Sequence, residues 1–251
     1  MIYREFKPDI LLRPYIETYW TISGFAGKEE FHKILPDGCV DIIFSTNEDK
    51  QFGLTPFIPN IIGTMTTYLN GSYSNHINVI GIRFKPVGLT AFLRTPLYEF
   101  TDQRMDLNLA ETLFDESFYT ELTKKSGIQE QVSYFDSYLT GRLAHAYNID
   151  NRIIYATDLI QQTKGLISLA EVASKSCLSP RQFERRFKAA TGISAKMFSK
   201  IIKFKHTALY LESNSDLSLF LVAVDCGYYD LSHLTKDFKT FTGTPPSNFR
   251  L

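Results

Sequence analysis

Hydrophobic and polar positions follow a short period in the first part of the chain and a longer period in the second. Four early segments are short, rich in β-branched and aromatic residues, and bounded by Gly, Pro, Asn or Asp. This composition predicts β-strands over residues 19–25, 40–45, 58–64 and 79–84. The sequences Pro36-Asp37-Gly38 and Asn70-Gly71 indicate turns. Short helices are expected over residues 89–93 and 107–113.

A longer helix is predicted next, by one apolar stripe. Its residues recur at intervals of four, three, four and four: Ile128, Val132, Phe135, Leu139 and Leu143. That spacing places them on one helical face. The face can cover the sheet of its own chain or pair with the same helix of a second chain, and the pattern leaves both open. The polar stretch 147–152 indicates a domain boundary.

From residue 151 onward the pattern is helical, and an internal repeat organises it. Residues 187–192 (FKAATG) recur as residues 238–243 (FKTFTG), 51 positions later. At the same offset Phe183 matches Leu234, and Phe198 matches Phe249. We therefore predict two copies of one helical unit, each about 40 residues long.

Each copy carries the signals of a helix-turn-helix. In the first, Ser168 and Glu171 predict a capping box, and Ser179 with Pro180 predicts the start of a second helix that Gly192 ends. In the second copy Asp230 is the expected cap. The positions expected to face inward are Phe183, Phe187, Leu234, Phe238 and Phe241.

The outward faces of the two second helices carry the candidate DNA-binding residues. Arginine can bind guanine O6 and N7 through its planar fork, glutamate can accept from cytosine, and hydroxyl or apolar groups can meet other base edges. Arg186 and Lys188 are better placed for phosphates, which fix register. An ordinary solvated basic face is the alternative for the first helix, and mere exposure to water for the second. The candidates are Arg181, Glu184, Arg185, Arg186, Lys188, Leu231, Ser232, Thr235 and Lys236.

One long helical pattern over residues 195–212 joins the two copies. Its 18 residues span about 27 Å at 1.5 Å per residue. Two recognition helices must lie about 34 Å apart to enter successive major grooves on one face of DNA. A rigid helix of this length is a suitable spacer.

Composition adds a division of charge. The 251 residues hold 27 Lys and Arg against 27 Asp and Glu, yet residues 1–150 carry a net −6 and residues 151–251 a net +6. A basic half favours a nucleic-acid partner for that half. Three scattered cysteines and the absence of a long apolar segment favour a cytoplasmic protein with no membrane partner.

The repeat resembles the tandem helix-turn-helix domain of the AraC/XylS family of bacterial transcription regulators. The residues that carry the resemblance are 179–188, 191–194, 226–234 and 238–246. Two departures are Ala195, where the family commonly has proline, and the apolar Phe220-Leu221 pair. The resemblance implies transcription control, with double-stranded DNA, RNA polymerase and a second copy of the chain as partners. It implies base contacts by Arg181, Glu184, Arg185, Leu231, Ser232, Thr235 and Lys236.

The first half is similar to the N-terminal domain of one branch of that family, through residues 36–44, 81–89 and 101–102. The resemblance implies an α+β protein. In better-known members of the family the N-terminal domain is a small β-barrel that binds an effector and helps to dimerise the protein, but for this branch the resemblance implies no particular ligand. We expect residues 1–146 to form a small β-barrel-like or mixed domain with helices that binds an effector and dimerises, and residues 151–251 to form an all-α DNA-binding domain. The alternative for residues 1–146 is a protein-interaction module with no ligand.

Other chemistry is less well supported by the residues. Trp20, with Tyr15, Tyr19, Phe25 and Phe31, could line an effector pocket, and Arg83 could pair with an anionic effector. Core packing of the rings and a salt bridge from Arg83 to Asp37 or Asp41 are the favoured interpretation. We expect no metal site, no cofactor and no enzymatic activity. The enzymatic rival, a DNA-repair methyltransferase with a similar DNA-binding module, needs a cysteine cluster that three dispersed cysteines do not provide.

Overall fold

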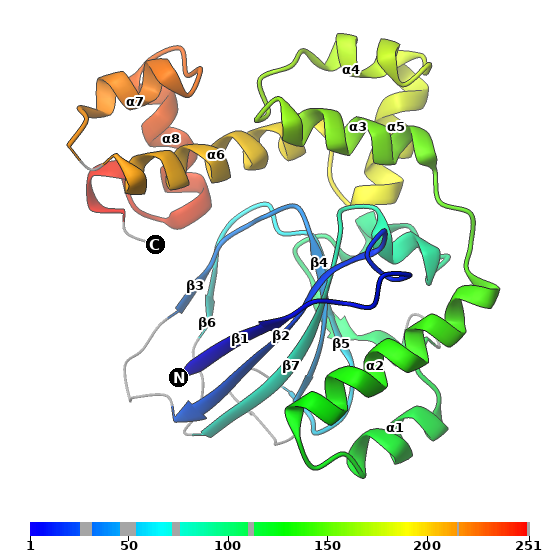
Figure 1. Cartoon of the computed structure of the whole chain (residues 1–251). Coiled ribbons are helices and arrows are strands. Elements are labelled where there is room, and N and C mark those ends of the chain that lie inside the picture. The colour runs from blue at the N-terminus through cyan, green and yellow to red at the C-terminus, as the bar shows by residue number, and fades with distance from the viewer. Residues whose placement is uncertain (26–31, 46–53, 72–75, 110–112, 215, 250–251) are drawn as a thin grey trace.

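In a computed structural model the chain has two parts. The N-terminal part contains the sheets, and the helical C-terminal part lies across one end of it (Figure 1). The structure describes residues 1–25, 32–45, 54–71, 76–109, 113–214 and 216–249. Phe31 and residues 110–112 of the helix expected over 107–113 lie outside the described residues. The mixed α+β class expected from the sequence is confirmed.

The strands form two antiparallel sheets. A six-stranded sheet has the order β1-β2-β7-β4-β5-β8, and β3 and β6 form a separate two-stranded sheet. The N-terminal part is therefore a large sheet faced by a small one, instead of a single continuous ladder. The strands are β1 (Ile2–Phe6), β2 (Ile16–Phe25), β3 (His32–Ile34), β4 (Val40–Ser45), β5 (Asn60–Ile62), β6 (Leu69–Gly71), β7 (His76–Phe84) and β8 (Arg104–Asp106).

Most of the helices lie after the last strand, β8, and from there on the described elements are all helical. Short 3₁₀ segments lie at η1 (Gly88–Ala91), η2 (Leu97–Phe100), η3 (Leu107–Leu109), η4 (Leu143–His145) and η5 (Pro246–Asn248). The α-helices are α1 (Glu116–Thr123), α2 (Ile128–Arg142), α3 (Asn151–Gln162), α4 (Leu169–Lys175), α5 (Pro180–Thr191), α6 (Ala195–Ser213), α7 (Leu219–Asp225) and α8 (Leu231–Thr242). The four predicted strands, the helix after residue 128 and the long spacer helix are confirmed.

The alternation of side chains along the central strands separates two cores. On β4 and β7, Ile42, Phe44, Ile80 and Ile82 face α1 and α2 and are fully or almost fully buried. Successive residues of a strand point to opposite faces, so the residues next to them in each strand, including Ile43 and Val79, face the other side. One face of the sheet therefore builds the main core. The opposite face carries a second, smaller group of apolar residues.

Helix α2 lies against the sheet of its own chain (Figure 1), and the apolar residues of its stripe pack in the core beneath it. Val132, Phe135 and Leu139 are 4%, 0% and 0% exposed, and the ring centroid of Phe135 lies 5.0 Å from that of Phe44. Of the two roles that the sequence left open, the structure shows the intrachain core. The same stripe is not available for dimerisation, because its side chains already contact this chain.

We expect Leu139→Ala to lower the free energy of unfolding by about 2–5 kcal/mol, because it leaves a cavity in a packed core. Chemical denaturation followed by circular dichroism measures the change. Ser133→Ala on the exposed side of the same helix is the matched control and should have little effect. A variant with unchanged stability but altered sedimentation would contradict the intrachain assignment.

Candidate functional site

The first candidate recognition helix, α5, has a sharply defined start and end. The Ser179 hydroxyl accepts from the Gln182 backbone amide, and the Gln182 side chain accepts in return from the Ser179 amide. Pro180 occupies the first turn, and Gly192 ends the helix with φ of +87°. The capping box that the sequence predicts at the start of α4, from Ser168 and Glu171, forms only in part. Ser168 does cap that helix, but the Glu171 carboxylate binds Lys175 at 2.9 Å.

Two phenylalanines hold α5 so that its basic face points outward. Phe183 and Phe187 are 3% and 0% exposed, and the Phe187 ring lies 5.5 Å from that of Phe198 on α6. The structure brings four predicted residues onto the exposed side of the helix: Arg181, Glu184, Arg185 and Lys188. Arg186 is half-buried, and its Nη1 binds the Asp150 carboxylate at 3.2 Å in the segment that leads into α3.

The second candidate recognition helix, α8, is built in the same way. Asp230 accepts from the His233 amide at 2.8 Å, and Leu234, Phe238 and Phe241 are fully buried. An ion pair of 2.9 Å from Lys200 to Asp237 fastens α8 to α6. The predicted outer residues Leu231, Ser232 and Lys236 are exposed, Thr235 is half-buried, and all four line one shallow hollow.

The spacer helix α6 carries the two units on one rod. Its 19 residues span about 28 Å, and Ser194 caps its first turn. Two of its lysines have partners inside the domain. Lys200 pairs with Asp237, and the Lys203 ammonium lies 3.9 Å from the centroid of the Tyr228 ring, where burial lowers the pKa of Lys203. Lys196 and Lys205 stay exposed.

The N-terminal part contacts equivalent residues of both units. The last carbonyls of a helix lack partners within it. At the end of α5, Thr64 and Thr101 donate to the carbonyls of Thr191 and Gly192, both at 2.6 Å. At the end of α8, Lys33 and Thr67 donate to the carbonyls of Thr242 and Thr240, both at 2.7 Å. Thr191 and Thr242 are the same position of the repeat, so the N-terminal part binds both units at this position.

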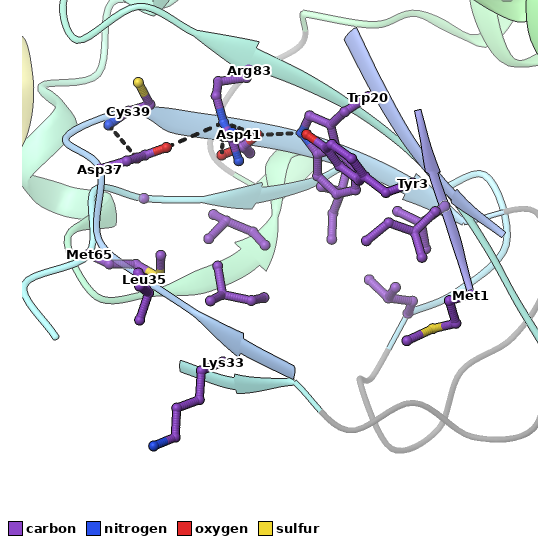
Figure 2. A pocket seen from close by; sticks show the side chains of 17 residues that line it. Met1, Tyr3, Trp20, Lys33, Leu35, Asp37, Cys39, Asp41, Met65 and Arg83 are labelled. Atoms are coloured by element: carbon purple, nitrogen blue, oxygen red, sulfur yellow. Dashed lines mark hydrogen bonds and ion pairs between the residues drawn. The ribbon is translucent and has the colours of Figure 1, made fainter. Parts of the chain in front are cut away.

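A cavity of about 370 Å³ lies on the face of the large sheet that α1 and α2 do not cover (Figure 2). Most of its wall is apolar, and β3 forms its opposite side. The lining residues are Met1, Tyr3, Trp20, Ile22, Lys33, Ile34, Leu35, Asp37, Cys39, Asp41, Ile43, Leu54, Ile62, Gly63, Met65, Val79 and Arg83.

One end of the cavity is polar. The Arg83 Nε atom lies 3.5 Å from the Asp37 carboxylate and 3.3 Å from the Asp41 carboxylate, so Arg83 makes the expected salt bridge with both aspartates. The Trp20 indole donates to Asp41 Oδ1 at 2.6 Å. Burial raises the pKa of Asp41 to about 6, against the opposing effect of Arg83. Burial also raises the pKa of the Cys39 thiol well above its usual value, which leaves it a poor nucleophile.

Backbone positions without side chains make this arrangement possible. Trp20 lies opposite Gly81 in the ladder, and a methyl group on Gly81 would sit 2.1 Å from Trp20 Cε2. The turn that carries Asp37 packs on the DNA-binding part, since a Cβ atom on Gly38 would lie 2.7 Å from Phe198 Cε2. The indole therefore lies flat on β7, and the polar end of the cavity adjoins α6.

Among the aromatic residues considered from the sequence, Trp20 lines the cavity. Tyr19 points into the opposite core and donates to Asp136 at 2.9 Å, Tyr15 packs on Phe92, and Phe25 is 76% exposed. Tyr3 also lines the cavity and was not expected from the sequence, because residues 2–6 (IYREF) show no alternation of apolar and polar positions that would mark a strand. The threonines that hold the helix ends had no sequence signal, because their partners lie far along the chain.

Comparisons with known proteins match the two halves separately. A helix-turn-helix domain family matches residues 172–251, and a family described as a domain of unknown function (DUF6597) matches residues 4–106. The C-terminal domain of AraT, a response regulator from Geobacillus stearothermophilus, is 26% identical with a TM-score of 0.36, over 38% of this chain and 80% of that one. No curated protein matches the chain.

Two structures of ToxT from Vibrio cholerae align along most of the length. One is 10% identical with a TM-score of 0.49 and covers 91% of this chain and 96% of that one. The other, wild-type ToxT with a bound unsaturated fatty acid, is 14% identical with a TM-score of 0.42, over 91% and 92% of the two chains.

The capped, repeated helix pairs and the family match define the class of the C-terminal part, which is a DNA-binding helix-turn-helix domain. The domain, over residues 172–251, is of the AraC type, in agreement with the resemblance of its sequence. No helix of the described ranges combines the length and apolarity needed to cross a bilayer. No cluster of three or more His, Cys, Asp or Glu side chains in those ranges could hold a metal ion.

We expect Gly81→Ala to shift the fluorescence maximum of the chain to longer wavelength, because the added methyl group displaces the indole toward solvent. Trp20 is the single tryptophan, so emission reports this site alone. Gly141→Ala on α2 is the control, since nothing lies within 4 Å of the position its Cβ would take. Identical spectra for wild type and Gly81→Ala would contradict the described packing.

Proposed function

We propose that the chain regulates transcription by reading two successive major grooves of DNA with the outer faces of α5 and α8. The observation that carries this proposal is the pair of recognition helices, each anchored inward by apolar residues and exposed outward, on one rod. We assign base contacts to Arg181, Glu184, Arg185, Leu231, Ser232, Thr235 and Lys236, and phosphate contacts to Arg186 and Lys188.

The two units are not equal readers. The exposed face of α5 offers two arginines and a glutamate, which can discriminate guanine and cytosine. The face of α8 offers hydroxyl, apolar and lysine groups, which favour a less specific contact. Arg186 is held by Asp150 in the free protein, so its phosphate contact requires that this half-buried ion pair opens. We expect the first unit to dominate sequence preference.

Residues 1–146 and 151–251 act as two domains in this proposal. The main core of the first is built from residues up to Leu139, and that of the second almost wholly from Ile153 onward, with Val87 as the exception. This distribution supports the boundary. Because the first domain caps the ends of both α5 and α8, it sets the spacing and orientation of the two readers.

The cavity in the first domain is the proposed effector site, and it adjoins the contacts between domains. Lys33 and Gly63 line the cavity. Lys33 also binds the end of α8, and Thr64, which follows Gly63 in the chain, binds the end of α5. The turn that carries Asp37 meets Phe198 on α6. A ligand that shifts these segments would change how the readers are held. The cavity favours this role over an interaction module without a ligand.

Three further expectations stay predictions. They are a homodimer, contact with RNA polymerase and a cytoplasmic location. A dimer would have to use a surface other than the stripe on α2, because that stripe lies in the core.

We expect Arg185→Ala to weaken binding to the best DNA site by about 1–3 kcal/mol and to relax preference at one base pair. Selection from a randomised duplex library, at two salt concentrations, measures both effects. Arg186→Ala is the matched control and should leave base preference intact. Equal loss of affinity for every sequence would make Arg185 a phosphate contact, and no sequence preference in the wild type would end the proposal.

We expect the double variant Thr67→Val/Thr101→Val to bind DNA sites with altered spacing between their two halves almost as well as the site with the normal spacing, which the wild type prefers. The substitutions remove one hydroxyl donor from the end of each recognition helix and leave carbonyls without partners. Binding to duplexes lengthened by one or two base pairs between the halves measures the effect. Thr90→Val, which removes a hydrogen bond within the first domain, is the control. Unchanged discrimination of spacing would exclude the first domain as the part that sets it.

A further inference from the structure

Among the described residues that line the cavity, the charged side chains at its polar end do not balance. Asp37 and Asp41 share a single guanidinium, that of Arg83. Lys33 lines the far end, but its ammonium leaves the cavity, donates to the Thr242 carbonyl at 2.7 Å and lies 5.3 Å from the centroid of the Tyr68 ring. Figure 2 shows Lys33 pointing away from the polar end. Two carboxylates therefore face the cavity with one cation between them.

The excess negative charge of Asp37 and Asp41 is partly buried, where it is less stable than in water. The Asp41 side chain is 14% exposed and that of Asp37 is 21% exposed. A buried carboxylate without full compensation attracts a cation or a proton. Burial accordingly raises the pKa of Asp41 to about 6, despite its contacts with Arg83 and Trp20. The free protein is thus left with an electrostatic demand that a positive ligand would satisfy.

Two aromatic rings stand next to these carboxylates. The rings of Tyr3 and Trp20 lie 6.4 Å apart in a stacked arrangement and form one wall of the cavity (Figure 2). The face of an aromatic ring attracts a cation, and tryptophan does so most strongly. Beyond the rings the walls are aliphatic: Ile22, Ile34, Leu35, Ile43, Leu54, Ile62, Met65 and Val79. This region suits the apolar body of a ligand.

We propose that the cavity binds a small lipophilic organic cation, a hydrophobic amine or quaternary ammonium ion. Its charged head lies beside Asp41 and the rings of Tyr3 and Trp20, and its hydrocarbon body lies among the aliphatic residues toward β3. The volume of about 370 Å³ falls in the usual range for small-molecule sites. A carboxylate ligand is disfavoured, because it would have to displace two aspartates from Arg83. This assignment rests on the proposed effector role of the cavity.

A series of ligands with one hydrocarbon body and different heads tests the charge directly. The probes are 4-phenylbutylamine, 4-phenylbutyltrimethylammonium, 4-phenylbutanol and 4-phenylbutanoate, titrated into the full chain at pH 7.5. Trp20 fluorescence and thermal stability are the readouts. We expect both cations to change the emission and raise the melting temperature, the alcohol to bind at least tenfold more weakly, and the carboxylate to give no effect. Equal or stronger binding of the carboxylate, or no binding by either cation, would overturn the proposal.

Asp41→Asn provides the matched variant. The amide oxygen still accepts from Trp20, but the charge is lost, so affinity for the quaternary ion should fall at least tenfold while that for the alcohol changes little. Asp136→Asn is the control, because that carboxylate accepts from Tyr19 on the opposite face of the sheet. If Asp41→Asn and Asp136→Asn bind the quaternary ion equally well, Asp41 is not its partner and the proposal fails.

The pH dependence of quaternary ion binding gives a second readout, because that ligand does not titrate. Protonation of Asp41 removes the attraction, so affinity should fall as the pH is lowered through about 6. The groups around Asp41 are Asp37, Arg83, Trp20, Tyr3 and Cys39. A flat profile between pH 5 and 7.5 would contradict the assignment of the cation to these carboxylates.

The outcomes separate this inference from the proposed function. If neither cation binds the full chain but the chain still binds DNA with sequence preference, the proposed cation site is wrong and the proposed function stands. Binding of the alcohol or carboxylate in its place would keep the cavity as an effector site and change its chemistry.

Discussion

Side-chain alternation along β4 and β7 is the constraint on which both the core and the cavity depend. Each strand sends one set of residues to α1 and α2 and the other set to the opposite face. Ile42 and Ile82 therefore lie in the core, while Asp41 and Arg83, which are paired across the ladder, meet at the cavity. A shift of register by one residue would bury the charges and expose the apolar residues, so the core itself fixes where the polar site forms.

The repeat imposes a second constraint, on the contact between the domains. Because the two helical units end in the same way, they offer the same unpaired carbonyls to any neighbour. The first domain uses threonine hydroxyls and one lysine to satisfy these carbonyls at the ends of both α5 and α8. The repeat thus supplies two equivalent attachment points. Lys33 lines the cavity and also binds the end of α8, so the cavity and this contact share a residue.

Much of the fold could be predicted where local patterns are long. The stripe on α2, the strands of the centre of the sheet, and the caps at Ser179 and Asp230 are all marked by neighbouring residues. Strands of three residues, such as β3 and β6, contain too few positions to show a period. The salt bridge of Arg83 was expected with one aspartate or the other, and it forms with both because the turn before β4 brings Asp37 beside Asp41.

By itself the sequence determined the two-part organisation, the tandem helix-turn-helix, the residues on its outer faces and the AraC-type resemblance, because repeats, caps and periodicity are properties of adjacent residues. Only the tertiary structure decided that α2 covers its own sheet, that Tyr3 joins Trp20 in the cavity wall, and that Lys33 turns away from it. The partners concerned are far apart in the chain, 127 residues for Thr64 and Thr191 and 209 for Lys33 and Thr242. Contacts at such separations depend on how whole elements pack, and no local pattern encodes them.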